Sequence, residues 1–109
     1  MHLLSAQKGT LSEEGEALDL GQSPGEVIFL SAADTELAAL AQARGTVGDC
    51  SWRMASLMQL RHPLSVDTYV QKTLSKAKLV VVRALGGASY FAYALEAFHA
   101  AAINGGFEI

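Results

Sequence analysis

The feature that most constrains the fold is a run of four apolar residues, Leu-Val-Val-Val at 79–82, in which three residues are β-branched. The run shows no alternation of apolar and polar residues, so we expect both faces of the resulting strand to be buried. Such strands are typical of the centre of a parallel sheet that carries helices on both faces. The run therefore predicts an α/β fold with residues 79–82 in the central strand, where Val81→Asp would bury an unpaired charge and unfold the chain.

The turn after this run is the first candidate ligand site. Gly86 and Gly87 end the strand, and Ser89 is placed to cap the next helix. Domains of the α/β class usually bind ligands where a strand, a glycine turn and a helix N-terminus follow one another, because backbone N–H groups there attract anions. The turn matches neither a dinucleotide-binding nor a P-loop motif, so a tight connection that needs positive φ is the simpler explanation of the two glycines.

Two more strands and a helix are predicted before this run. Residues 26–31 contain four consecutive apolar residues and predict a buried strand. A helix is expected to follow, capped by Asp34 or Thr35 and ended by Gly45. Residues 52–56 alternate weakly and predict a third strand.

Two further helices complete the pattern. Ser65 is expected to cap the first of them, whose apolar stripe consists of Val66, Tyr69, Val70, Leu74 and Ala77. The second is expected at residues 90–103. Strands that alternate with helices predict a parallel sheet with right-handed crossovers. We therefore expect an α/β fold, a small parallel-sheet βαβ sandwich of flavodoxin-like or Rossmann-like type.

The two ends of the chain carry weaker signals. Residues 1–6 predict a short first strand, and residues 17–20 a short extended piece. Residues 104–109 indicate a helix stop followed by the first residues of another strand. We therefore expect residues 1–109 to form a single α/β domain that is truncated at its C-terminus and is the amino-terminal piece of a much longer chain.

Composition excludes several classes of protein. The 109 residues are 50% hydrophobic and carry a net charge of −3, which favours a folded, soluble protein. Basic residues are scattered singly, which argues against binding nucleic acid. No apolar run approaches the roughly 20 residues that span a membrane, and no signal peptide is recognisable. The single cysteine, Cys50, agrees with a reducing compartment, so we expect a cytoplasmic location.

One histidine is a candidate ligand or general base. His62 precedes Pro63 on the C-terminal side of a predicted strand, where sites of α/β domains gather. His2, His99 and Cys50 have no partners at metal-ligand spacing. We therefore predict no metal site and no catalytic set within these residues, and no cofactor bound by this chain alone.

Aromatic residues cluster near the glycine turn, at Tyr90, Phe91, Tyr93 and Phe98. They suit either a surface that faces a base or a tetrapyrrole, or the packing of a helix on a sheet. Core packing is favoured, because a helix that covers a sheet needs large apolar side chains on its inner face.

Four segments in order carry a resemblance to a known family. Residues 18–25, 29–38, 60–70 and 77–90 resemble the start of the large subunits of aerobic cobaltochelatases, a family that includes the large subunit of magnesium chelatase, the H subunit. The segments follow one another in register over nearly the whole chain, which makes the resemblance far more specific than any one motif.

The resemblance implies a role in cobalamin biosynthesis. The full large subunit is expected to bind the corrin precursor hydrogenobyrinate a,c-diamide and Co²⁺, which is inserted with ATP hydrolysis in a ligase reaction that forms nitrogen–metal bonds. Separate AAA+ ATPase partner subunits are expected to handle the ATP. The resemblance carries no catalytic residue onto these positions, so this region is expected to be a scaffold or docking part without activity of its own.

Two departures and two alternatives accompany the resemblance. Leu64 stands where the family is expected to have Met, and residues 91–94 replace an expected Trp-Pro-Tyr-Gly, which weakens any specific role for the aromatic cluster. The first alternative is a free-standing flavodoxin-like module that binds a small molecule at Gly86 and Gly87. The second is an interaction domain without a ligand.

Overall fold

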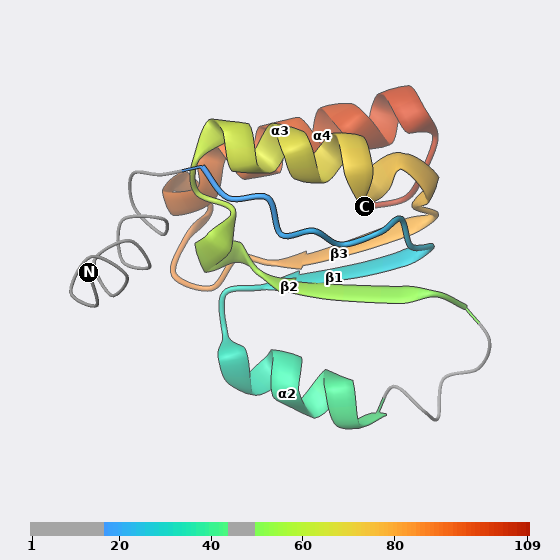
Figure 1. The fold of residues 1–109 in the computed structure, drawn as a ribbon. Helices are drawn as coiled ribbons and strands as arrows, with labels where there is room; N and C mark the ends of the chain where they lie inside the picture. The colour runs from blue at the N-terminus through green and yellow to red at the C-terminus, as the bar shows by residue number, and fades with distance from the viewer. Residues whose placement is uncertain (1–16, 44–49) are drawn as a thin grey trace, which may run out of the picture.

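The computed structural model describes residues 17–43 and 50–109 (Figure 1). The strand predicted at residues 1–6 and the helix stop predicted at Gly45 lie outside the described residues.

The sheet has three parallel strands, β1 (Val27–Ser31), β2 (Trp52–Ser56) and β3 (Leu79–Arg83), in the order β2-β1-β3. The predicted α/β class is thereby confirmed. The order places the second strand on one side of the first and the third on the other, which is how flavodoxin-like sheets begin and differs from the Rossmann order.

The central strand is β1, so the prediction that residues 79–82 form the centre of the sheet is wrong. Val80 in β3 is 1% exposed, but Leu79 is 40% exposed and Val81 is half-buried. An apolar run shows that both faces of a strand avoid water, yet it does not say which neighbours cover them. In β3 one face is covered and the other is partly open.

The helices form two layers of unequal size (Figure 1). The helices α3 (Pro63–Lys72) and α4 (Ala92–Gly105) lie together on one face of the sheet, and α2 (Asp34–Ala43) lies alone on the other. We call these the α3/α4 face and the α2 face. Short 3₁₀ helices precede α3, follow it and precede α4, namely η2 (Leu57–Gln59), η3 (Leu74–Lys76) and η4 (Ala88–Phe91).

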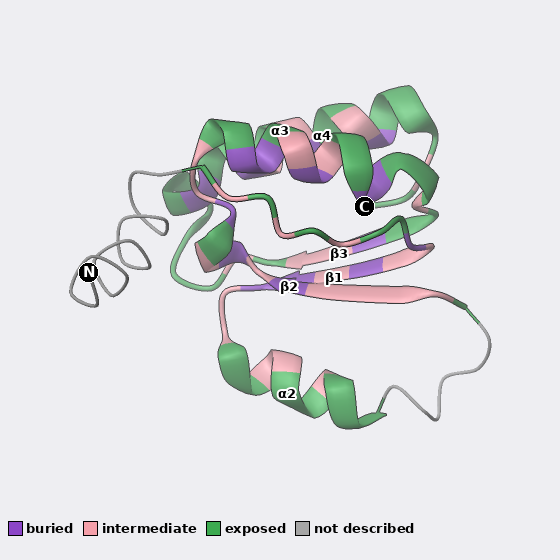
Figure 2. Cartoon of the chain, in the orientation of Figure 1, coloured by how far each residue is buried: buried purple, intermediate pink, exposed green. Residues whose placement is uncertain are grey.

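The core lies between the sheet and the α3/α4 layer (Figure 2). Ile28 and Leu30 of β1 are fully buried there, together with Val66 of α3 and Phe98 of α4. The rings of Tyr69 and Phe98 pack edge to face with centroids 6.5 Å apart, a geometry that aromatic pairs prefer. The helix α2 buries no residue fully, so the two faces of the sheet are unequally protected from water.

Residues 17–25, which include the extended piece predicted at 17–20, run as coil beside α3 (Figure 1). Ser65 does not cap α3 as predicted: it lies inside the helix, where its buried hydroxyl accepts the Leu18 N–H at 2.6 Å. The Tyr69 hydroxyl donates to Gln22 Oε1 at 2.7 Å, and Gln22 Nε2 donates to the Met54 carbonyl of β2 at 2.7 Å. Burial also raises the pKa of Tyr69 well above its usual value, so this hydroxyl remains a donor.

The helix predicted at residues 90–103 is present as α4, and the chain then returns to the sheet. Gly106 adopts φ 71° after the helix, the left-handed conformation that suits glycine at this position. Glu108 forms an isolated parallel bridge with Leu79 on the outer edge of β3. This bridge lies where the sequence predicted the first residues of another strand.

The unequal faces predict different effects for two adjacent valines. Val80→Asp places a carboxylate in the core, where no counter-charge is available, and we expect it to lower the free energy of unfolding by more than about 3 kcal/mol. Val81→Asp points to the partly open α2 face, so its carboxylate keeps contact with water and the loss is smaller. Urea unfolding followed by circular dichroism measures both, and equal losses would show that the two faces are equally buried.

Candidate functional site

Parallel strands end at the same side of a sheet, and the loops after β1, β2 and β3 form the carboxyl edge of this protein. It comprises residues 32–34, 57–62 and 84–90. The chain adds β2 on one side of β1 and then β3 on the other, so the order of strand addition reverses at β1. The crevice between β1 and β3 at this edge is therefore a topological switch point, where α/β domains commonly bind ligands. All four predicted ligand-edge residues, namely His62, Gly86, Gly87 and Ser89, are at this edge.

The loops after β2 and β3 meet through one cation–π contact. The Arg61 guanidinium carbon lies 4.4 Å from the centroid of the Tyr90 ring. Slightly farther along the two helices, the Tyr93 hydroxyl donates to Asp67 Oδ1 at 2.7 Å. These contacts join the beginning of α3 to the segment that leads into α4.

His62 has a structural role at this edge. It is the N-cap of α3, and its Nδ1 accepts the Leu64 N–H at 3.1 Å, with Pro63 at the first helical position. The sequence predicts the cap at Ser65 instead, because serine is a preferred N-cap and histidine is not. Pro63 was the available signal, because proline favours the first position of a helix and puts the cap one residue earlier.

The glycine turn has the positive φ angles that a tight connection between a strand and a helix requires. Gly86 and Gly87 adopt φ of 97° and 115°, and the Gly87 N–H donates to the Ala84 carbonyl at 3.3 Å. A Cβ at either glycine would meet no atom within 4 Å, so backbone conformation and not crowding demands glycine here. Ligand binding at this turn remains a prediction.

Ser89 does not cap α4, contrary to the prediction. It is exposed and lies within η4, and α4 begins at Ala92 after Phe91, which provides no side-chain cap. A 3₁₀ turn between the glycines and the helix separates Ser89 from the N–H groups that it was expected to satisfy.

Three side chains that are not among the predicted site residues lie together in the crevice between β1 and β3. The buried Ser31 hydroxyl donates to Glu36 Oε1 at 2.6 Å. Arg83 Nε donates to the same oxygen at 3.1 Å, and an Arg83 terminal nitrogen lies 2.7 Å from Glu36 Oε2. The Ser31 hydrogen bond, followed by the Arg83 hydrogen bond, holds the pKa of the Glu36 carboxyl below its usual value. No local sequence motif predicts this cluster, because Arg83 is 47 residues from Glu36 in the sequence.

This cluster limits what the carboxyl edge can bind. An anionic ligand at a switch point usually meets backbone N–H groups and a cation. Here the Arg83 guanidinium is already paired with the Glu36 carboxylate. The negative charge of that carboxylate repels a second anion. The arrangement is therefore an ion pair between two side chains of this protein and not a preformed phosphate site.

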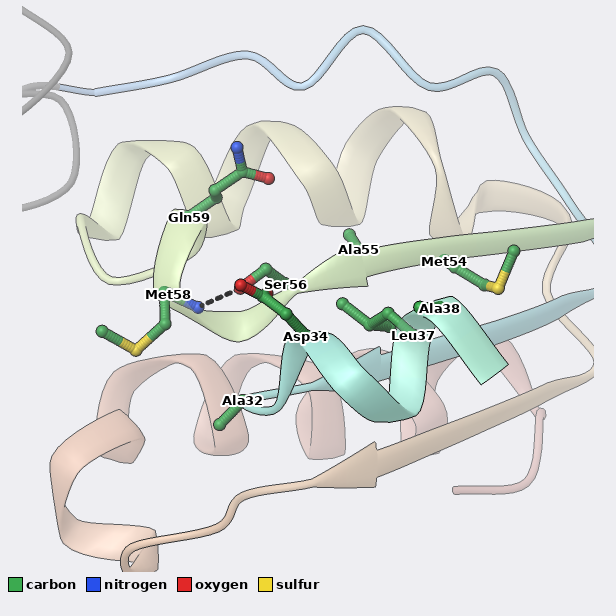
Figure 3. Close-up of a pocket in the computed structure, with 9 residues that line it drawn as sticks. All are labelled: Ala32, Asp34, Leu37, Ala38, Met54, Ala55, Ser56, Met58 and Gln59. Carbon is green, nitrogen blue, oxygen red and sulfur yellow. Dashed lines mark hydrogen bonds between the residues drawn. The ribbon is translucent and has the colours of Figure 1, made fainter. Parts of the chain in front are cut away.

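A cavity of about 650 Å³ opens on the other side of α2, against β2 (Figure 3). Its size is in the range of small-molecule sites. Asp34, Ser56 and Gln59 supply polar groups, and the remaining lining residues are apolar, namely Ala32, Leu37, Ala38, Met54, Ala55 and Met58. The Ser56 Oγ accepts the Met58 N–H at 3.1 Å, as Figure 3 shows, so this oxygen is engaged in the local fold. The lining therefore combines apolar side chains with the polar groups of Asp34, Ser56 and Gln59.

Within residues 17–43 and 50–109, no group of three or more His, Cys, Asp and Glu side chains is placed to hold a metal ion. None of the helices in the same residues is both long and apolar enough to cross a membrane.

The fold and the carboxyl edge define a small flavodoxin-like α/β unit with a cavity beside α2 and an ion pair at its switch point. Comparison with curated proteins gives the family. The chain is 63% identical over 110 aligned positions to the aerobic cobaltochelatase subunit CobN of a Sinorhizobium species, and 36% identical over 107 positions to that of Pseudomonas aeruginosa. The resemblance to cobaltochelatase large subunits is therefore confirmed, and the chain is a relative of the CobN proteins.

The matches cover 100% and 96% of this chain but 9% of each relative, so the chain spans less than a tenth of their length. No family model matches the chain. No solved structure matches it either.

The capping role of His62 predicts a small, specific loss of stability. We expect His62→Ala to lower the free energy of unfolding by about 1 kcal/mol, because the Leu64 N–H loses its acceptor. His62→Asn is the matched variant, since asparagine is a good N-cap, and it should recover most of that loss. Chemical denaturation measures both variants, and an equal loss in the two would contradict the capping role.

The Ser31–Glu36–Arg83 cluster predicts a dependence of stability on acid pH. The folded Glu36 pKa lies below the ordinary value of 4.5, so its stabilisation is fully present above pH 4.5 and is lost as the pH falls through the folded pKa. Glu36→Gln should therefore reduce stability at neutral pH and flatten the decline below pH 4.5. Glu96→Gln, which makes the same charge change at an exposed site on α4, is the control. Thermal unfolding between pH 3 and 7 tests this, and curves for Glu36→Gln that run parallel to wild type would contradict it.

Proposed function

We propose that this chain is the amino-terminal region of the large subunit of an aerobic cobaltochelatase. The observation that carries the proposal is 63% identity to a CobN subunit along the entire chain. An alignment that covers the whole chain at this identity reflects common descent of an entire segment and not a shared short motif.

The activity proposed for the complete subunit is the insertion of Co²⁺ into hydrogenobyrinate a,c-diamide during cobalamin biosynthesis. In this proposal Co²⁺ and the corrin precursor are substrates of the full subunit, and AAA+ partner subunits hydrolyse ATP to drive the reaction. The reaction forms nitrogen–metal bonds, as in the related magnesium chelatases. The cytoplasmic location expected from the sequence belongs to the same proposal.

The role that we propose for this region is scaffolding or docking, without chemistry of its own. The charged groups at the switch point support this, because Ser31, Glu36 and Arg83 satisfy one another instead of facing a substrate. Exposed apolar side chains near the carboxyl edge also support it: Leu85 follows β3, and Tyr90 and Tyr93 lead into and begin α4. Exposed apolar groups that gather in this way are typical of surfaces that contact other protein.

A second function, small-molecule binding by a flavodoxin-like module, is favoured by one observation, the cavity of about 650 Å³ beside α2. The Glu36 carboxylate at the switch point disfavours phosphate-bearing ligands such as flavin mononucleotide. The cavity itself is lined by Asp34, whose carboxylate also repels a phosphate group, so the cavity suits an uncharged group better than a nucleotide.

The central experiment compares this chain with the full-length protein in a cobalt-insertion assay. We expect the full-length protein to insert Co²⁺ into the corrin precursor when ATP and the ATPase subunits are present, and the 109-residue chain to insert none under the same conditions. The reaction is measured by the loss of the absorbance of the metal-free corrin precursor and by the amount of cobalt bound in the product. Insertion by the short chain would overturn the scaffold role, and failure of the full-length protein would overturn the chelatase assignment.

A titration separates the two functions. We expect the chain to bind neither flavin mononucleotide nor corrin tightly, as measured by fluorescence quenching and calorimetry. If one of them does bind, Ala38→Phe should abolish binding by filling the cavity, whereas Ala39→Phe, on the side of α2 away from the cavity, should leave it unchanged. Tight binding that Ala38→Phe removes would favour the small-molecule module over the scaffold.

A further inference from the structure

On the outer edge of β3, Glu108 forms the first hydrogen bonds of a further parallel strand pairing. Glu108 donates its N–H to the Lys78 carbonyl at 3.1 Å, and its own carbonyl accepts the Val80 N–H at 2.9 Å. Toward the sheet, the Leu79 N–H donates to Glu26 at 3.1 Å. Successive residues of a strand thus direct their backbone groups alternately outward and inward, as they do throughout β-sheets.

This alternation identifies the next unfilled position of the ladder. The Val80 carbonyl and the Val82 N–H point outward, and among the described residues Leu79–Glu108 is the bridge seen on this edge. In a parallel ladder both groups would bond to the residue two positions after Glu108. A residue that follows Ile109 therefore has a defined place beside β3.

The α2 face has a matching gap over the same strand. A groove of about 510 Å³ lies beside α2, with Phe29 of β1 and Leu40 and Ala39 of α2 among its apolar lining and the Glu36–Arg83 ion pair at its rim. Val81 pairs in register with Phe29, so its half-buried side chain is on the same face. The helix α2 packs mainly against β1 and β2, which leaves the part of this face over β3 without a helix (Figure 1).

We propose that polypeptide following Ile109 in the full-length protein completes this sheet: its first residues extend the strand beside β3, and a later helix fills the groove beside α2. The relatives are long enough to supply both, because the match covers only 9% of each. The groove suits a helix that packs parallel to α2, whose neighbours normally lie about 8–10 Å away between axes.

Topology determines which helix fills the groove. Right-handed crossovers from β3 outward place each connecting helix on the α3/α4 face, as α4 already shows. A helix on the α2 face therefore comes after the last strand of the sheet, when the chain crosses back over the edge. A second copy of this chain is the competing occupant, and it would pair through the same exposed edge of β3.

The test uses thiol reactivity in the full-length protein with Cys50 changed to Ser. Ala39→Cys places a thiol in the groove wall, and Gln42→Cys places one on the same helix but outside the groove lining. Both parent residues are exposed in this structure, so neither change is expected to disturb folding. Labelling with iodoacetamide and peptide mass spectrometry should show the thiol at 39 reacting at least about tenfold more slowly than the thiol at 42, because a covered thiol reacts only through local opening.

Equal reaction rates at the two positions would overturn the proposal. Protection that disappears when the protein is diluted to a monomer would also overturn it, since that result identifies a second copy as the occupant. A benzophenone attached at Gln42→Cys and photolysed should crosslink within one polypeptide to a segment after residue 109, and crosslinks between two chains would contradict the proposal. The inference rests on the similarity to long CobN chains and not on chelatase activity, so its failure leaves the cobalt-insertion assay unaffected.

Discussion

The whole structure depends on the pairing of β1 along both of its edges. Ile28 and Leu30 reach the α3/α4 face together with Val80, and the register of Leu30 with Ala55 brings β2 into the same core. A shift by one residue would move these side chains to the α2 face, where one helix gives them little cover. The buried face thus determines the register, and the register determines which loops meet at the carboxyl edge.

The same register places a charged side chain at the rim of the core, and the coil of residues 17–25 accommodates it. Arg53 pairs with Ile28, and its guanidinium donates to the Ser23 and Pro24 carbonyls, both at 2.9 Å, and to the Trp52 carbonyl at 2.7 Å. Its stem passes so close to Gly25 that a Cβ there would lie 2.7 Å from Arg53 Cγ. Gly25 is thus needed for space, and the coil shields the edge of β2 by satisfying the arginine.

The sequence predicted the strands and helices well, but it predicted poorly which strand is central and which residue caps α3. The difference has a physical reason. Apolar runs and helical periodicity report local burial, so the strands at β1, β2 and β3 and the helices were found within a few residues. Which strand is central depends on pairing between distant segments, and the apolar run at residues 79–82 lies in β3, beside the central strand β1. The cap of α3 was predicted at Ser65 instead of His62, because a cap depends on where the first helical turn starts, and the preceding loop sets that start.

The candidate site shows the same limit in its electrostatics. The glycine turn has the local conformation expected of an anion-binding edge, but the charge at the switch point comes from Glu36, which a strand-to-helix connection brings beside Arg83. Local sequence left a ligand edge and a tight turn as two explanations of the glycines, and the long-range ion pair adds a negative charge beside that edge, which disfavours anions there. A switch point that carries this ion pair, together with exposed apolar side chains and a partly open strand edge, supports the proposed docking role more than a ligand-binding role.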